Sequence, residues 1–273
     1  MSVAQALREA TARLSETSDT ARLDAELLMA HALGVGRSDM LLRHMDAEEP
    51  AEFAALVERR AHHEPIAYIL GEAEFFGRSF LVDPGVLIPR PDSESVVQVA
   101  LDHAPQEGRV LDLGTGSGAL LLTLLAERTG LTGVGIDASL AALPVAAANA
   151  ARLGLAGRAR ILRHNWREEG WAEGLGRFEL IIANPPYVES GAKLDPDVRD
   201  FEPPTALFAG PEGLDDYRII IPQLRDLLTE TGVCVLEIGR DQAEMVTEIA
   251  QLSGFQVELQ RDLADRPRAI VLT

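Results

Sequence analysis

The chain has 273 residues, 47% hydrophobic and 25% charged, a composition typical of a folded globular protein and not of a disordered or fibrous one. The 43 acidic and 25 basic residues give a net charge of -18, which disfavours binding to a phosphate backbone, so we expect no direct nucleic-acid partner. The single cysteine, the absence of a long apolar run and the lack of a secretion-signal pattern at the N-terminus predict a cytoplasmic protein with no internal disulfide and no membrane partner.

The first seventy or so residues predict a small helical domain, which we assign to residues 1–73. Apolar residues recur at helical spacing in three stretches: Val3, Ala6, Leu7, Ala10 and Leu14; Leu23, Leu27 and Ala30; and Phe53, Leu56 and Val57. Asp19 is a candidate N-cap of the second helix and Gly34 a candidate end, and Pro50 suits a helical first turn.

Residues 74–90 are β-prone and punctuated by Gly77, Pro84 and Gly85, which indicates a β-hairpin linker. From residue 91 to residue 273, short apolar runs alternate with helix-like stretches. The strand candidates are 110–113, 133–136, 161–162, 178–183, 233–238, 255–259 and 269–272. The alternation predicts an α/β domain with a mostly parallel sheet covered on both faces. Pro144 predicts a kink in the helix expected over 140–153, or a later start. A further helix is expected from Tyr217 to about Leu228.

A glycine-rich turn follows the first of these strands and opens a helix. Its residues are Gly114, Thr115, Gly116, Ser117 and Gly118. Glycines allow a tight turn and close approach of a ligand, and free N–H groups at the helix start favour a polar partner. The turn also fits a loose dinucleotide-binding pattern, and glycine-rich turns of this kind also occur for packing alone.

Asp137 ends the next strand, 23 positions after Gly114. An acid at this distance can accept hydrogen bonds from both hydroxyls of a ribose. The alternative is that Asp137 caps the following helix, a role that Ser139 could also fill.

Asn184-Pro185-Pro186-Tyr187 directly follows the strand over 178–183, at the sheet edge where α/β proteins bind ligands. The two prolines lack N–H donors and hold the backbone extended. The side-chain oxygen of Asn184 and the carbonyl of Pro185 form a pair of acceptors suited to an NH₂ group, and Tyr187 offers a flat face for stacking. The motif indicates a site for a planar amino group.

These motifs, in this order, resemble class I S-adenosylmethionine-dependent methyltransferases, and more narrowly the release factor glutamine methyltransferases of the HemK or PrmC family. The resemblance covers about residues 60–273. Supporting segments are 64–71, 87–91, 111–118, 184–187, 202–203, 206–207, 213–214 and 236–239. Two departures are Asp92-Ser93-Glu94, where the family has Glu-Thr-Glu after Pro-Arg-Pro, and Asn165, where relatives commonly carry an aspartate.

The resemblance implies a Rossmann-like methyltransferase domain with a seven-stranded sheet, preceded by a helical domain that binds the substrate. It implies N5-methylation of the glutamine in the Gly-Gly-Gln motif of class 1 peptide chain release factors, with S-adenosylmethionine converted to S-adenosylhomocysteine. Catalysis would fall to Asn184, Pro185 and Tyr187, which with Pro186 would also bind the substrate. The cofactor would contact residues 114–118, Asp137, Asn165, Trp166 and Asn184. For Trp166, partial burial in the core is the alternative.

Three other functions remain as alternatives at this stage. An adenine-N6 or other nucleic-acid amino methyltransferase could use the same tetrapeptide, but the net charge of -18 argues against it. An inactive cofactor sensor and a dehydrogenase are less consistent with the tetrapeptide. We expect a monomer and no metal, because His62 and His63 lack a second ligand cluster. Arg90 is assigned no catalytic role: an ion pair and a contact to the loop over 184–216 are equally possible.

Overall fold

The computed structural model describes residues 1–262 and 264–273, which divide into two compact units. The first comprises Met1–Glu72 and Leu194–Phe201, and the second comprises Ala73–Lys193 and Glu202–Thr273. The segment Leu194–Phe201, which we expected within the C-terminal domain, is therefore grouped with the first unit. In the described part of the chain, no helix is both long enough and apolar enough to cross a membrane.

The first unit is helical. Its elements are α1 (Val3–Leu14), α2 (Ala21–Leu33), α3 (Arg37–Arg43), α4 (Phe53–Ala61), α5 (Ile66–Leu70) and α9 (Pro196–Phe201). The apolar faces of α1 to α5 form one core that includes Leu14, Leu28 and Phe53, and α9 has no buried residue. A buried ion pair between Arg60 Nε and Asp24 Oδ2, 2.7 Å apart, joins α4 to α2. This pairing compensates the cost of burying two charges.

Two details of α2 differ from the sequence prediction. Leu23 is 43% exposed, because the helix turns Ala21, Asp24 and Leu28 inward. Asp19 is not the N-cap; Thr20 occupies that position, and its hydroxyl bonds to Asp24 Oδ1 at 2.8 Å. The end of the helix at Gly34 is confirmed, and this residue adopts a left-handed conformation with φ of 67°.

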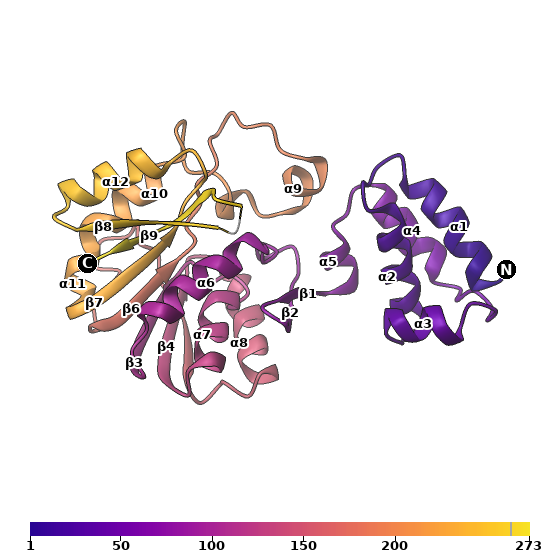
Figure 1. Ribbon diagram of the computed structural model, residues 1–273, viewed down its shortest axis with the longest axis horizontal. Helices are drawn as coiled ribbons and strands as arrows, with labels where there is room; N and C mark the ends of the chain where they lie inside the picture. Colours follow the sequence, from indigo (N-terminus) through magenta and orange to yellow (C-terminus); the bar gives the residue numbers. More distant parts are fainter. Residues whose placement is uncertain (263) are drawn as a thin grey trace. The chain divides into compact units, whose positions relative to one another are not determined.

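The second unit is built on a seven-stranded sheet in the order β5-β4-β3-β6-β7-β9-β8 (Figure 1). The strands are β3 (Glu107–Leu113), β4 (Gly130–Asp137), β5 (Ala159–Arg163), β6 (Phe178–Ala183), β7 (Leu228–Glu237), β8 (Val257–Arg261) and β9 (Pro267–Leu272). Strands β3 to β7 pair in parallel, and β9 runs antiparallel to both β7 and β8. A separate two-stranded sheet joins β1 (Glu72–Phe75) to β2 (Arg78–Leu81). The predicted fold class is confirmed.

Helices cover both faces of the sheet, as the sequence predicted. They are α6 (Asp92–His103), α7 (Ala119–Glu127), α8 (Ala142–Arg152), α10 (Asp215–Ile220), α11 (Leu224–Leu227) and α12 (Ala243–Leu252), with 3₁₀ turns η1 (Pro204–Ala206) and η2 (Ile221–Gln223). Val110 packs in the core beneath α6, α7 and α8, whereas Leu111 and Leu113 pack in the core beneath α10, α11 and α12. Successive side chains of a strand point to opposite faces, so both layers are apolar.

Prolines shape two of these helices. The helix predicted over 140–153 begins at Ala142, so the later start allowed for Pro144 is the one observed. The single helix predicted from Tyr217 to Leu228 is instead divided into α10, η2 and α11. Pro222 lies at the division, where the missing N–H cannot support a continuous helix.

Candidate active site

A cavity of about 480 Å³ lies in the second unit, at the carboxyl ends of the central strands. From β3 the chain proceeds outward through β4 and β5, and then returns to the other side of β3 with β6. Such a reversal in strand order is where open α/β sheets bind ligands. The cavity is lined by Gly85, Val86, Leu87, Gly114, Gly116, Asp137, Ala138, Ser139, Ala142, Asn165, Trp166, Arg167, Asn184, Pro186, Pro203, Thr205, Ala206 and Asp216.

The glycine-rich turn forms one wall of this cavity. The amides of Gly114 and Thr115 both donate to the carbonyl of Ile136 at 2.9 Å, which anchors the turn to the end of β4. Gly116 has a φ of 53°, and a Cβ built on it would have no atom within 4 Å. Glycine is favoured in this conformation, and the space beside it remains open. The turn is thus fixed by its backbone and leaves room for a ligand.

Asp137 joins the glycine-rich turn to the segment after β4. Its Oδ2 accepts the Gly116 amide at 2.9 Å, and its Oδ1 accepts the Ser139 amide at 2.8 Å. Burial raises the pKa of Asp137, and these backbone hydrogen bonds oppose that shift. Asp137 therefore orders the local backbone, but it does not cap the following helix: the N-cap of α8 is Ala141, without a side-chain capping hydrogen bond, so neither Asp137 nor Ser139 fills that role. Each carboxylate oxygen has further acceptor capacity, so a ligand donor can still bind.

Asp112 is fully buried beneath the same turn. Its Oδ2 accepts the Thr115 hydroxyl at 2.7 Å, and its Oδ1 has no hydrogen-bond partner among the residues that the structure describes. Burial raises the pKa of Asp112 to about 7; the Thr115 hydrogen bond opposes this shift and the charge of Asp137 adds to it.

Trp166 lies beside the glycine-rich turn and lines the cavity, and it also packs, partly buried, against the core. A Cβ on Gly114 would lie 3.2 Å from Trp166 Cη2, a tight contact, and the φ of 76° at this position also favours glycine. The indole Nε1 donates to Asp216 Oδ1 at 2.7 Å, and Arg167 Nη2 donates to the same oxygen at 2.8 Å. Asn165 also lines the cavity, but its Oδ1 accepts the Arg167 amide at 3.0 Å. The buried Asp216 thus fixes the position of the Trp166 ring.

Asn184 lies at the carboxyl end of β6 and lines the cavity. Its Nδ2 donates to Ser93 Oγ at 3.5 Å, the long end of the hydrogen-bond range. Within the described residues, neither its Oδ1 nor the Pro185 carbonyl oxygen accepts a hydrogen bond from the protein. These are the two acceptors predicted from the sequence. Pro186 also lines the cavity, whereas Pro185 and Tyr187 are not among the residues that line it.

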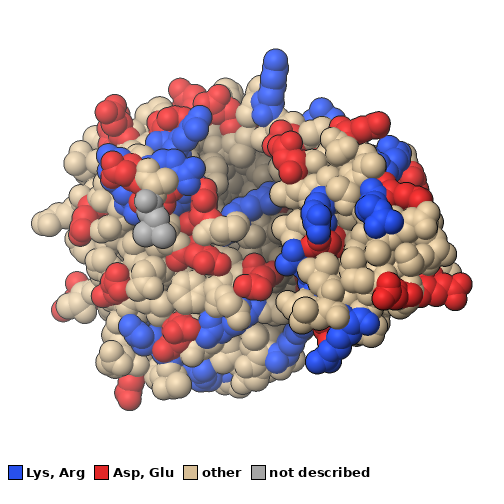
Figure 2. Space-filling view, turned by 45° about the vertical axis from the view of Figure 1, so that its right-hand side comes forward, with Lys and Arg blue, Asp and Glu red and all other residues tan. Residues whose placement is uncertain are grey.

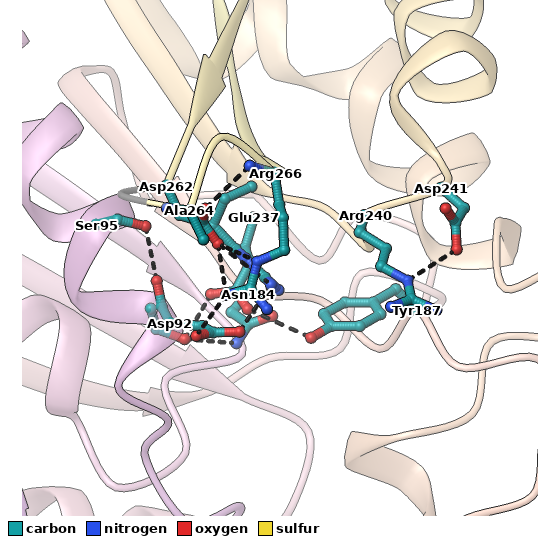
Figure 3. A network of polar contacts seen from close by, with 12 residues as sticks. Asp92, Ser95, Asn184, Tyr187, Glu237, Arg240, Asp241, Asp262, Ala264 and Arg266 are labelled. Atoms are coloured by element: carbon teal, nitrogen blue, oxygen red, sulfur yellow. Dashed lines mark hydrogen bonds and ion pairs between the residues drawn. The ribbon is translucent and has the colours of Figure 1, made fainter.

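Tyr187 belongs to a buried polar network behind Asn184 (Figure 3). Its hydroxyl donates to Glu237 Oε1 at 3.4 Å, and Ser93 Oγ donates to Glu237 Oε2 at 2.6 Å. Burial raises the pKa of Tyr187 to about 12, and the charge of Glu237 adds to this shift. The Gln242 side chain donates to the Tyr187 carbonyl at 3.0 Å, which fixes the backbone after the prolines.

Arg90 and Glu202 connect two segments that line the main cavity, one around Leu87 and the other around Thr205. Arg90 Nη2 forms a short ion pair with Glu202 Oε1, and the Ile88 amide donates to Glu202 Oε2 at 3.2 Å. For Arg90, an ion pair and a contact to the loop over 184–216 were the two predicted alternatives. Because Glu202 lies in that loop, the observed ion pair with Glu202 is both.

A smaller cavity of about 60 Å³ adjoins the first and shares Gly114, Gly116 and Asn184 with it. Thr115 and Ser117 line this second cavity. Gly118 lines neither cavity and occupies the N-cap position of α7, with a φ of 83°. The structure thus groups most of the predicted residues around one continuous site.

Sequence reasoning assigned no role to Asp216, to Glu237 or to the partner of Arg90. For Asp92-Ser93-Glu94 it predicted only helix capping, but the N-cap of α6 is Pro91, without a side-chain capping hydrogen bond. Only Glu237 offered a local pattern, because it ends the buried apolar run of β7 on the same sheet edge as Asp137 and Asn184. Figure 2 shows acidic side chains spread among basic ones on the face that it displays, unlike the continuous basic surface of a duplex-binding protein.

Comparison with known proteins relates the chain to a family. The chain is 40% identical to the release factor glutamine methyltransferase of Nitratidesulfovibrio vulgaris over 97% of its own length and 92% of the relative. It is also 40% identical to the protein of that name from Cereibacter sphaeroides, over 99% of this chain and 98% of the relative. The chain belongs to the release factor glutamine methyltransferase family.

Two family models match separate parts of this methyltransferase. Residues 5–71 match the PrmC N-terminal domain, and residues 85–200 match the methyltransferase small domain. A crystal structure of a methyltransferase from Pyrococcus furiosus resembles the fold, with a TM-score of 0.55, 17% identity, and coverage of 79% of this chain and 95% of that one. The family match confirms the resemblance recognised in the sequence.

Proposed function

We propose that this methyltransferase uses S-adenosylmethionine to methylate the side-chain amide nitrogen of a glutamine, in the Gly-Gly-Gln motif of class 1 peptide chain release factors. The observation that carries the proposal is the pair of acceptors at the end of β6, Asn184 Oδ1 and the Pro185 carbonyl, neither of which accepts a hydrogen bond within the described chain. Two such acceptors match the two N–H groups of a carboxamide. The names of the relatives support the same substrate.

The residues around the main cavity fit S-adenosylmethionine. The volume of about 480 Å³ lies within the range of roughly 300–1,000 Å³ that small-molecule pockets span. Open space beside Gly116 admits a ligand close to the backbone, Asp137 can accept hydroxyl donors, and the ring of Trp166 provides an apolar wall. When bound, the cofactor supplies an activated methyl group attached to a positively charged sulfur. Gly114, Gly116, Asp137, Asn165, Trp166 and Asn184 line this cavity and would hold the cofactor. Thr115 and Ser117 line the adjoining smaller cavity, and Gly118 lines neither.

The chain contributes to the reaction mainly by positioning. A carboxamide nitrogen is a poor nucleophile because its lone pair is delocalised into the carbonyl. Asn184 Oδ1 and the Pro185 carbonyl would accept its two N–H groups, fix the amide plane and favour a pyramidal nitrogen. Holding reacting groups in this way contributes a large part of enzymatic rate enhancement. Tyr187 would stack on the amide plane. No covalent intermediate is needed: the amide nitrogen would take the methyl group directly, its N–C bond forming as the bond from sulfur to the methyl carbon breaks, which leaves S-adenosylhomocysteine. The methylated nitrogen is acidic and would lose its extra proton to the acceptor carbonyls or to water, so no dedicated base is required.

The remaining assignments extend the proposal to the whole chain. The helical domain, predicted over residues 1–73, would hold the release factor, and the hairpin segment over 74–90 would link it to the domain over 91–273. The cytoplasmic location and the monomeric state stay predictions.

The decisive experiment is a methyl-transfer assay with labelled S-adenosylmethionine. The purified protein is incubated with a class 1 release factor and, as a matched control, with the same factor carrying alanine in place of the motif glutamine. Mass spectrometry should locate one added methyl group on the motif glutamine and none in the control. Label in a nucleic acid, or on another residue, would contradict the proposed substrate.

A further inference from the structure

Behind Asn184 lies a chain of hydrogen bonds that connects three elements distant in the sequence. Asn184 follows β6, Ser93 lies in the first turn of α6, and Glu237 ends β7. Ser93 is 4% exposed and Glu237 is 1% exposed, so both side chains are buried, and Ser93 also lines the smaller cavity beside Asn184. In the catalytic proposal above, Asn184 and Tyr187 touch the substrate, whereas neither Ser93 nor Glu237 has any role.

The direction of these hydrogen bonds follows from the number of protons available. A serine hydroxyl has one proton, and Ser93 donates it to Glu237 Oε2 at 2.6 Å. The Ser93 oxygen can then only accept, so it selects the NH₂ side of the Asn184 amide, whose Nδ2 lies 3.5 Å away. A reversed amide would place Asn184 Oδ1 against the lone pairs of Ser93 Oγ. Unfavourable contact between two acceptors disfavours that orientation.

The same carboxylate also contacts Tyr187, whose hydroxyl lies 3.4 Å from Glu237 Oε1. In Figure 3 the Tyr187 hydroxyl points toward the group formed by Asn184 and Glu237. The Tyr217 hydroxyl donates to the backbone carbonyl of Glu237 at 2.8 Å and fixes the end of β7. One buried carboxylate therefore orients two side chains of the tetrapeptide.

We propose that Ser93 and Glu237 are positioning residues, which fix the Asn184 amide so that Oδ1 and not Nδ2 is presented to the substrate. We name the series Asn184, Ser93 and Glu237 the amide relay. The inference rests on the proposed function for its effect on turnover, but the orientation itself is a property of the protein alone. The long contact between Asn184 and Ser93 is consistent with a site whose hydrogen bonds tighten when substrate binds.

The relay depends on the ionisation of Glu237. Burial raises the pKa of Glu237 to about 7, while the Ser93 hydrogen bond, the charge of Arg268 and the Tyr187 hydrogen bond oppose the shift, and the charge of Asp92 adds to it. Tyr217 is the further titratable group in contact. When Glu237 is protonated, its O–H can donate to Ser93 Oγ. The Ser93 hydroxyl can then donate to Asn184 Oδ1, which favours the reversed orientation of the Asn184 amide. We expect kcat to fall as the pH drops through about 7.

The test compares Ser93→Ala with Ser95→Ala, two serines of the same helix. The Ser95 hydroxyl donates to the Asp92 carbonyl at 2.7 Å and takes no part in the relay. Ser93→Ala should lower kcat by about 10- to 100-fold, with KM for the cofactor changed by no more than about threefold. Ser95→Ala should retain the wild-type kcat, and Ser93→Thr, which keeps the hydroxyl, should recover most of it. Equal kcat values for Ser93→Ala and Ser95→Ala would overturn the relay.

Glu237→Gln provides a second test if Ser93→Ala does not fold. This variant should lose about tenfold or more in kcat at pH 8, and its profile should lack the decline below pH 7. A wild-type rate with an unchanged acidic limb would overturn the role of Glu237.

A substrate-free measurement separates the relay from the proposed function. Nuclear magnetic resonance of ¹⁵N-labelled protein, with the Asn184 side-chain signal assigned through Asn184→Asp, reports the hydrogen bonding of Nδ2. Ser93→Ala should shift this signal, and Ser95→Ala should leave it unchanged. Failure of the wild-type enzyme to methylate a release factor would defeat the proposed function alone. An Asn184 signal that is identical in wild type and Ser93→Ala would defeat the relay alone.

Discussion

The two sides of the site are built over very different distances along the chain. On the glycine-rich side, Thr115 bonds to Asp112 three positions away, and Gly116 bonds to Asp137 21 positions away. On the Asn184 side, Asn184 contacts Ser93 across 91 positions, and Ser93 bonds to Glu237 across 144. The first side is a consequence of one strand-turn-helix unit and its neighbour, whereas the second exists only after the sheet and α6 have assembled.

This difference suggests a division of function. The glycine-rich side is held by backbone amides and depends little on distant elements, which suits the binding of an unvarying cofactor. The Asn184 side is held by side chains from separate elements, so the orientation of its acceptors responds to packing and to ionisation. Variants on the first side should therefore change cofactor affinity, and variants on the second should change turnover.

The largest expected effect is that of Asn184→Ala. Removing one of the two acceptors for the substrate amide should lower kcat by roughly 10²–10³-fold, the loss usual for a preorganised hydrogen-bonding group at a reacting centre. The dissociation constant for S-adenosylmethionine, measured by calorimetry, should stay within about threefold because the glycine-rich side is intact. Unchanged turnover would remove Asn184 from the mechanism.

The reverse pattern is expected for Asp137→Ala. Loss of a charged acceptor should weaken cofactor binding by about 10- to 100-fold, corresponding to roughly 1.5–3 kcal/mol. Turnover at saturating cofactor should fall much less. Asp137→Asn keeps an acceptor of similar shape and serves as the control, with a smaller loss. Calorimetry that returned wild-type affinity for Asp137→Ala would refute the ribose assignment.

Buried acids on both sides should make stability depend on pH. The folded-state pKa values of Asp112 and Glu237 are both raised to about 7, so the folded protein binds protons more tightly than the unfolded chain. This stabilisation is fully present below the ordinary pKa of each acid and is lost as the pH rises through about 7. The free energy of unfolding in urea should fall by about 5 kcal/mol between pH 5 and pH 8, with roughly half of the decline from each acid.

Glu237→Gln distinguishes the two acids, because it removes one titration and leaves that of Asp112. The unfolding free energy of this variant should decline less steeply over the same pH range. Parallel curves for wild type and variant would show that Glu237 does not titrate there.

The smallest effect is expected for Asp216→Asn, which weakens the anchor of Trp166 without removing the ring. Cofactor affinity should decrease by about threefold to tenfold, consistent with loss of one charge-assisted hydrogen bond. Asp215→Asn is the matched control, since Asp215 precedes Asp216 and its side chain is 42% exposed. Tryptophan fluorescence during cofactor titration reports both variants. Equal affinity for the two would indicate that the Asp216 contact does not position Trp166.

Much of the fold could be predicted from the sequence, because its determinants are local. Alternating apolar runs and turn residues indicated the strands, and the positions of Gly114 and Asn184 directly after parallel strands placed both at one sheet edge. The exceptions have equally local causes. Asp19 was a plausible N-cap, but Asp24 accepts hydrogen bonds from the hydroxyls of Ser18 and Thr20, and Thr20 is the N-cap. Pro222 interrupts the helix that apolar periodicity alone predicted to be continuous.

The sequence by itself determined the sheet, the glycine-rich turn and the tetrapeptide with its two acceptors, since each follows from residues close together in the chain. Tertiary structure alone decided the partners of these groups. It determined which hydroxyl faces Asn184, which carboxylate accepts the hydrogen bond from that hydroxyl, and which acid accepts the hydrogen bond from the Trp166 indole. Hydrogen bonds are directional and short, so a partner is defined only when packing brings two groups within about 3 Å. The spacing of residues along the chain therefore does not predict which distant groups become hydrogen-bond partners.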